Sequence, residues 1–148
     1  MCQEVLEIVQ EMDRKQIEVK MALQCAPVLT GIKISNLLNV EREYEGSVCR
    51  ILRNTGIVSY RLLSCENKTV FLLFQRQELD LYLKEPKVQA FFISNGYKDL
   101  SLKGILKKFQ KRYATYMIRG GKFPHEMGLL LGYPVEDVQG FIEHKGKD

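Results

Sequence analysis

The sequence predicts an α+β fold in which a small, mainly antiparallel sheet is covered by helices. Two apolar segments rich in β-branched and aromatic residues, 57–65 and 69–75, flank the polar triplet 66–68, which is the pattern of a β-hairpin. Apolar residues at helical spacing fill most of the chain on either side of this 57–75 hairpin. A local strand pair with segregated helices favours α+β over a doubly wound parallel sheet.

The elements before the hairpin follow from periodicity and from the helix-breaking residues. Residues 3–24 have the spacing of an amphipathic helix, which a proline then interrupts. The apolar, β-branched segment 26–34 is predicted to be a buried strand or an extended segment. Ser35 is expected to cap a short helix over 37–40, and a further helix is predicted over 41–54.

After the hairpin the pattern is helical to the end of the chain. A regular apolar stripe and a row of lysines on another face make the central helix of this half the clearest. The last two helices enclose Gly132 and Pro134 and predict a tight helix-turn-helix-like corner. The predicted helices are 77–83, 87–94, 101–116, 125–131 and 135–144.

Length and composition predict one cytoplasmic domain spanning residues 1–148. A chain of 148 residues can bury a sizeable core, and its 45% hydrophobic and 27% charged content is that of a globular protein rather than a disordered one. No apolar run is long enough to span a bilayer, and acids at Glu4, Glu7 and Glu11 exclude a secretory signal. The four cysteines form no C-x-x-C pair, which favours reduced thiols over a disulfide framework.

The charge is concentrated in residues 98–122, where eight basic residues stand against the single acid Asp99. Such a region can attract phosphate, nucleic acid or an acidic partner, although a solvated helix face has the same pattern. Reading of DNA by the last helix is disfavoured, because Glu136 and Asp137 would face the phosphates.

A catalytic interpretation rests on three residues. Cys25 is a candidate nucleophile, His125 the base that would activate it, and Glu126 the acid that would orient the histidine. The alternatives are a small buried hydrophobe at Cys25 and helix capping by His125 and Glu126. The cysteines lack the short-loop spacing of a zinc site, and the phosphate- and dinucleotide-binding fingerprints are missing, so no metal and no cofactor are predicted.

A binding interpretation rests on cations near the predicted sheet. Lys33, Arg61 and Arg76 could gather into a pocket for a small anion, because the guanidinium fork suits phosphate and carboxylate groups. Scattered surface charge would leave the same residues in the sequence, so both readings stay open.

Several motifs carry a resemblance to a known family. They are residues 25–33 (CAPVLTGIK), 72–76 (LLFQR), 123–128 (FPHEMG), 132–134 (GYP) and 137–142 (DVQGFI). In these motifs, which extend over nearly the whole chain, the protein resembles those grouped as domain of unknown function 3793. The resemblance implies a bacterial cytoplasmic protein without an established activity, and an aromatic, cysteine-bearing tail that relatives carry after the Lys-Gly segment at 145–146 and that is expected to be missing here. It points to these site residues: Cys25, Pro27, Lys33, Arg76, His125, Glu126 and Tyr133.

Three functions therefore remain open. The first is a non-enzymatic module that binds a small anion or a protein partner, with Lys33, Arg61, Arg76 and Tyr133 as ligand contacts. The second is a cysteine-dependent enzyme that uses Cys25 and His125. The third is nucleic-acid binding through the basic region 98–122.

Overall fold

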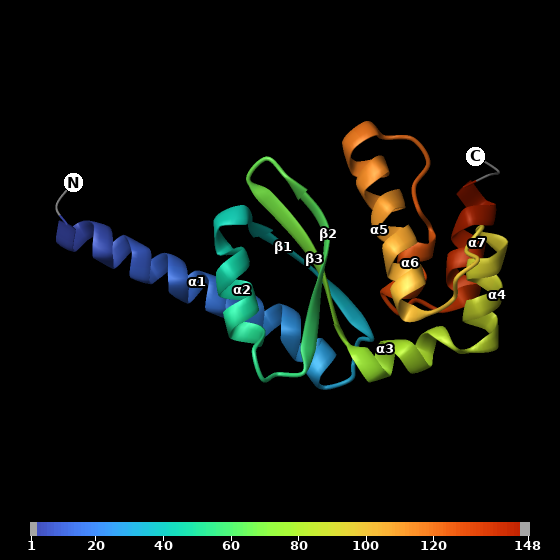
Figure 1. Cartoon of the computed structure of the whole chain (residues 1–148), viewed down its shortest axis with the longest axis horizontal. Helices are drawn as coiled ribbons and strands as arrows, with labels where there is room; N and C mark the ends of the chain where they lie inside the picture. Colours follow the sequence, from blue (N-terminus) through green and yellow to red (C-terminus); the bar gives the residue numbers. More distant parts are fainter. Residues whose placement is uncertain (1–2, 146–148) are drawn as a thin grey trace.

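The computed structural model describes residues 3–145 and confirms the α+β class (Figure 1). A three-stranded antiparallel sheet of order β1-β3-β2 lies between two groups of helices. The elements are α1 (Gln3–Leu29), β1 (Ser35–Glu41), the 3-10 turn η1 (Arg42–Tyr44), α2 (Glu45–Leu52), β2 (Ile57–Cys65), β3 (Lys68–Gln75), α3 (Arg76–Leu83), α4 (Pro86–Ser94), α5 (Leu102–Arg119), α6 (Glu126–Leu130) and α7 (Val135–Lys145).

The first third of the chain differs from the prediction. Helix α1 continues through Pro27 to Leu29, so the strand or extended segment expected over 26–34 was wrong. The helix ends where Gly31 takes a φ of +79°. The short helix expected over 37–40 was also wrong, because this segment is strand β1, which pairs along its whole length with β3.

The predicted hairpin is confirmed. Strands β2 and β3 are antiparallel, and the chain turns between them at Glu66, which has a positive φ of 54°. Strand β3 is the central strand, so its side chains are buried on both faces of the sheet. Phe71 and Leu73 point to one face, whereas Leu72 and Phe74 point to the other.

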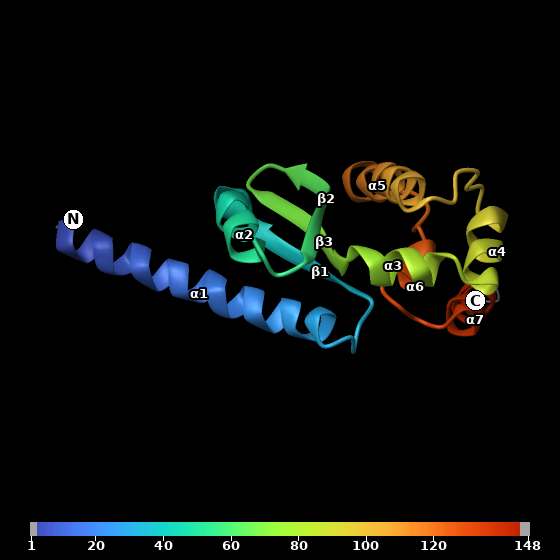
Figure 2. The same ribbon diagram turned by 60° about the horizontal axis from the view of Figure 1, so that its bottom comes forward.

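The two faces carry separate hydrophobic clusters. Helices α1 and α2 cover one face, where Met21 and Val48 pack against Leu38 and Leu73. Helices α3 to α7 form the second cluster against the opposite face, and the two ribbon views show them gathered at one end of the molecule (Figures 1 and 2). The site described below belongs to this second group.

Helix α5 has the two faces that its sequence predicts. Ser101 caps its first turn by accepting a hydrogen bond from the backbone N–H of Gly104, and its apolar stripe, which includes Phe109 and Tyr113, is buried. The row Lys103, Lys107 and Lys111 is exposed on another face.

The C-terminal corner is less regular than predicted. Helix α6 has only 5 residues, and Gly132 with a φ of +92° reverses the chain before α7 begins. The structure does not confirm a helix-turn-helix unit. Leu129, Leu130 and Val138 instead bury this corner against the second cluster. Within residues 3–145, none of the helices combines the length and apolar character that crossing a bilayer requires.

Candidate functional site

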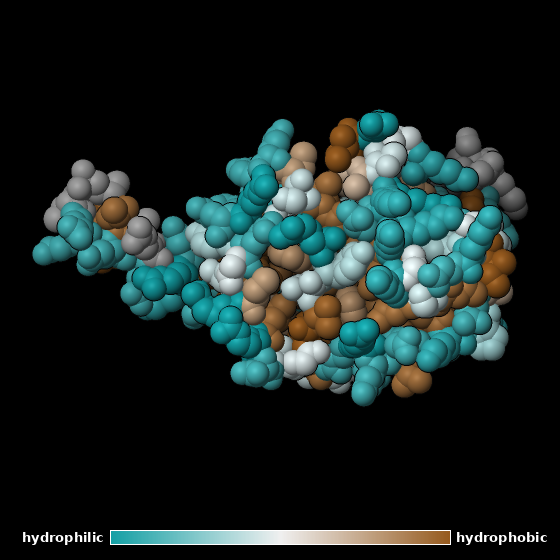
Figure 3. Space-filling view, in the orientation of Figure 1, coloured by the Kyte–Doolittle hydropathy of each residue, from teal (hydrophilic) through white to brown (hydrophobic). Residues whose placement is uncertain are grey.

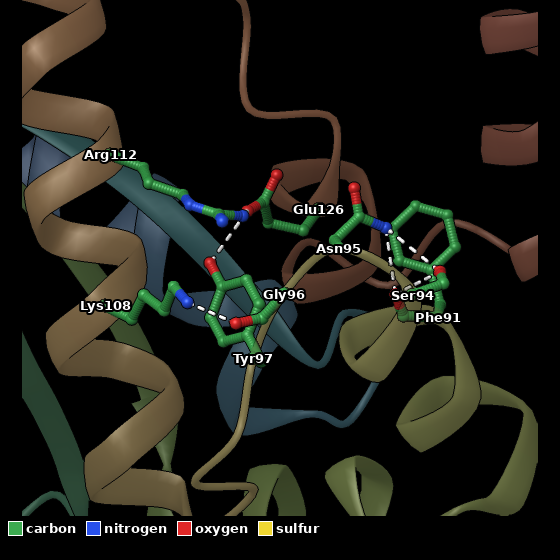
Figure 4. A network of polar contacts seen from close by, with 8 residues as sticks. All are labelled: Phe91, Ser94, Asn95, Gly96, Tyr97, Lys108, Arg112 and Glu126. Atoms are coloured by element: carbon green, nitrogen blue, oxygen red, sulfur yellow. Dashed lines mark hydrogen bonds and ion pairs between the residues drawn. The ribbon is translucent and has the colours of Figure 1, made fainter.

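The most buried charged group in the described chain belongs to Glu126, the first residue of α6, whose exposure is only 2%. Two donors converge on its Oε2 atom: the Tyr97 hydroxyl at 2.8 Å and the Arg112 Nη1 at 2.8 Å (Figure 4). A buried carboxylate is tolerated only when it is paired and hydrogen-bonded. These three residues therefore join the end of α4, helix α5 and the start of α6.

Tyr97 occupies a fixed place in this cluster. It follows Gly96, which ends α4 with a φ of +89°, and its ring lies beneath two cations: the Arg112 Cζ at 4.9 Å from the ring centroid and the Lys108 Nζ at 5.2 Å. Lys108 also donates to the Gly96 carbonyl. A Cβ at position 96 would lie 3.2 Å from the Arg112 Nη2, so a side chain there would crowd the guanidinium, and the positive φ would strain it.

The phenol of Tyr97 is a permanent donor in this setting. Its burial, together with the Glu126 carboxylate beside it, raises the pKa of Tyr97 well above its ordinary value, and the nearby Arg112 only partly offsets this. Tyr97 therefore stays protonated at physiological pH. Its role is to hold Glu126 in place rather than to accept protons.

A basic hollow of about 700 Å³ opens beside this cluster. It lies between the end of α4, one face of α5 and the segment 120–126, whose two glycines have positive φ values of 76° and 101°. Its cationic lining comes from Lys111, Arg112 and Lys122, and His125 also lines it. Glu126 is the only acid among the lining residues, and Arg112 already neutralises it. The hollow therefore carries an excess of positive charge.

The Arg112 side chain is 37% exposed, although one of its nitrogens is bound to Glu126. A guanidinium has five N–H donors in a fixed fork, so a single bond to the carboxylate leaves donors available for an anion in the hollow. Glu126 thus acts as a buried anchor that fixes the direction of this fork.

An apolar hollow of about 360 Å³ adjoins the basic one, and Phe123 and His125 line both. The His125 ring lies 5.3 Å from the Phe123 ring and 5.8 Å from the Phe141 ring, measured between centroids. Tyr116 extends this row from the other end, 5.3 Å from Phe123. His125 therefore belongs to an aromatic row that separates the two hollows.

The structure does not bring the predicted catalytic residues together. Cys25 is buried in the cluster between α1 and the sheet, and burial raises the pKa of its thiol. His125 lies in the helical group on the opposite face of the sheet, and the hydrogen bonds of Glu126 described above go to Tyr97 and Arg112. This arrangement gives no support to a Cys25–His125 pair.

The predicted anion ligands are divided between two places. Lys33 and Tyr133 line a common groove of about 440 Å³ that also contains the acid Glu78, and Arg76 begins the helix next to it. Arg61 lies in the middle of β2, and its Nη2 atom is 2.6 Å from the Glu45 Oε2. The four residues therefore do not form one site, because Arg61 lies on β2 and does not line the groove that Lys33 and Tyr133 share.

Tyr97 and Arg112 are the site residues that sequence reasoning missed. Arg112 counted only as one of the basic residues of the region 98–122, and Tyr97 carried no motif. The one local signal was the Asn95-Gly96 pair, which predicts the end of a helix and so places Tyr97 directly after it. No group of three or more His, Cys, Asp or Glu side chains that could hold a metal ion occurs within the described residues.

No curated protein and no solved structure was found to match this chain. A family model does match it, over residues 21–148, which include α2 to α7, the whole sheet and both hollows. The chain therefore belongs to the family described as protein of unknown function (DUF3793).

Proposed function

We propose that this protein is a non-enzymatic binding module for a small anionic ligand, and that the ligand occupies the basic hollow between α4, α5 and the segment 120–126. The observation that carries the proposal is the convergence of Lys111, Arg112 and Lys122 on one concave surface, where the only acid is already paired. Cations that surround a hollow attract phosphate or carboxylate groups more strongly than cations on a flat surface.

Two features favour binding over catalysis. Tyr97 is held as a protonated donor, and the Cys25 thiol is buried in the other cluster, so neither supplies a nucleophile or base to the hollow. Free thiols at Cys25, Cys49 and Cys65 are those of a protein in a reducing compartment such as the cytoplasm.

The test is binding of inorganic phosphate, pyrophosphate and citrate at low ionic strength, followed by calorimetry and by the thermal unfolding midpoint. The lining variant Lys111→Gln/Lys122→Gln is compared with the control variant Lys103→Gln/Lys107→Gln, which removes two exposed lysines of α5 outside the hollow. Each variant removes two positive charges from a net charge of +4.

We expect wild type and the control variant to bind at least one of these anions, and the lining variant to lose at least about tenfold in affinity, a factor typical of one lost charge-assisted hydrogen bond. Equal losses in both variants would show non-specific attraction. No saturable binding of any of the three anions to wild type would refute the proposal.

Nucleic-acid binding is the second candidate, and the exposed row Lys103, Lys107 and Lys111 is the observation that favours it. The same two variants separate the candidates. If a single-stranded or duplex oligonucleotide binds along this row, the control variant should bind it more weakly than wild type does, and the affinity should fall steeply with salt. Small-anion binding should be unaffected by that variant.

A further inference from the structure

The outward face of α1 carries an apolar stripe that is interrupted once, at Gln16. In both ribbon views the N-terminal half of this helix projects from the rest of the molecule (Figures 1 and 2). The stripe residues are spaced by 3, 4, 7 and 4 positions, which places them on one side of a helix. They are Val5 (47% exposed), Ile8 (60%), Met12 (56%), Val19 (59%) and Leu23 (69%).

This stripe is not part of the core of the fold. The residues of α1 that pack on the sheet, which include Ile17 and Met21, lie on the opposite side of the helix. On the side that the surface view shows, the projecting end is mainly hydrophilic and carries a small hydrophobic patch (Figure 3). Because a helix of this kind gains most of its stability from packing an apolar face, the stripe indicates a partner.

We propose that the stripe pairs with the same stripe of a second copy of this chain, with the two α1 helices antiparallel. The charges along the helix carry this assignment. Residues 3–13 contain four acids and no base, whereas residues 14–20 contain Arg14, Lys15 and Lys20 against the single acid Glu18. An antiparallel pair places each acidic half on the basic half of the other copy, and a parallel pair would place like charges together.

Glu11 and Lys15 give the pairing a specific contact. They lie one helical turn apart along the same edge of the stripe, and both belong to the exposed part of α1. When two antiparallel helices cross between these positions, Glu11 of each copy meets Lys15 of the other, so the contact occurs twice. The stripe faces away from the sheet, so the two sheets and their helices stay clear of one another.

Two further observations favour a second copy of the chain as the partner of the stripe, rather than a membrane surface or a ligand that the whole family binds. Helices that bind membranes carry Lys and Arg on their polar face, whereas the projecting half of α1 is acidic. The family match begins at Met21, so four of the five stripe residues precede the matched region. The pairing is independent of the anion proposal, because it uses the opposite end of the molecule.

The first experiment measures molar mass by sedimentation equilibrium over a range of concentrations. The molar mass of wild type should rise with concentration from 17.2 kDa towards twice this value. Met12→Lys should remain near the monomer mass at concentrations where wild type is dimeric, whereas the control Leu81→Lys, which changes a 64% exposed residue of α3 in the same way, should dimerise like wild type. Far-UV circular dichroism checks that α1 stays helical in both variants.

The second experiment tests the orientation. Glu11→Lys and Lys15→Glu should each weaken self-association by about tenfold, because each replaces two opposite-charge contacts with two like-charge contacts. A 1:1 mixture of the two variants should associate as tightly as wild type. A monomeric wild type at the highest concentration reached, or single reversals that leave the dimer unchanged, would overturn the antiparallel pairing.

Discussion

Replacing Arg112 by methionine is expected to destabilise the protein by about 3 kcal/mol, because it leaves the Glu126 carboxylate buried with a single donor. The carboxylate is 2% exposed, and its Oε2 loses the Nη1 contact at 2.8 Å while keeping the Tyr97 hydroxyl. Removing one partner of a fully buried ion pair costs about 3–5 kcal/mol. The low end applies, since the Arg112 side chain is 37% exposed and water can reach the carboxylate from that side. Methionine retains most of the packing of the arginine stem.

The assay is urea unfolding followed by circular dichroism, with the thermal midpoint as a second readout. A loss of this size should lower the midpoint by about 6–12 °C in a chain of this length. Lys111→Met on the same helix should change stability by no more than about 0.5 kcal/mol, because Lys111 is exposed. The double variant Arg112→Met/Glu126→Gln should recover more than half of the loss, since a neutral amide can still accept from Tyr97. A loss below about 1 kcal/mol in Arg112→Met, or simple additivity in the double variant, would refute the account of a buried charge held by Arg112.

Three further predictions concern other parts of the fold. Gly96→Ala should cost about 1–3 kcal/mol in urea unfolding, because residue 96 has a φ of +89° and a Cβ there would crowd the guanidinium above it; an unchanged midpoint would contradict this. Hydrogen bonds from the Ser101 hydroxyl and backbone N–H lower the pKa of Asp99. The stability that these bonds contribute is therefore present above the ordinary carboxyl pKa and is lost as the pH falls through the lowered pKa of Asp99. Ser101→Ala should move the Asp99 pKa upward in an NMR titration, and an unchanged pKa would refute the assignment. Burial raises the pKa of the Cys25 thiol, so alkylation of Cys25 should be slower than that of the exposed Cys49 at neutral pH, and fast labelling of Cys25 would reverse this reading.

The hairpin and α5 could be predicted from sequence because their signals are local. Alternating or helical apolar spacing and a polar turn lie within a few residues of one another in each. Strand β1 could not be predicted in this way. Its segment 35–41 contains two asparagines and begins with a good helix cap, and its strand conformation depends on pairing with β3, which lies some thirty residues later. Pro27 gave a further false signal, since the last turn of α1 accommodates it.

The candidate site was even harder to predict from local sequence signals. Glu126 and His125 attracted attention because they are adjacent in sequence, yet Glu126 contacts Tyr97 and Arg112, which lie on two other elements. No periodicity links residues 97, 112 and 126, because the contact arises from how α4, α5 and α6 pack. Burial of Glu126 is likewise invisible in the sequence, where an acid in the first turn of a helix is usually a solvated cap residue.

The two proposals place different demands on the family. The basic hollow and its anchoring triad lie wholly within the matched residues 21–148, so we expect relatives that bind the proposed class of ligand to share the buried acid, the phenol and the guanidinium. The α1 stripe lies mostly before Met21, so self-association does not have to accompany ligand binding in those relatives. Because Met12 lies on the projecting end of α1 and Lys122 lies beside the hollow, substitutions at these two positions should act additively. Anion affinity that depends on Met12 would instead mean that the hollow is shaped by the second copy.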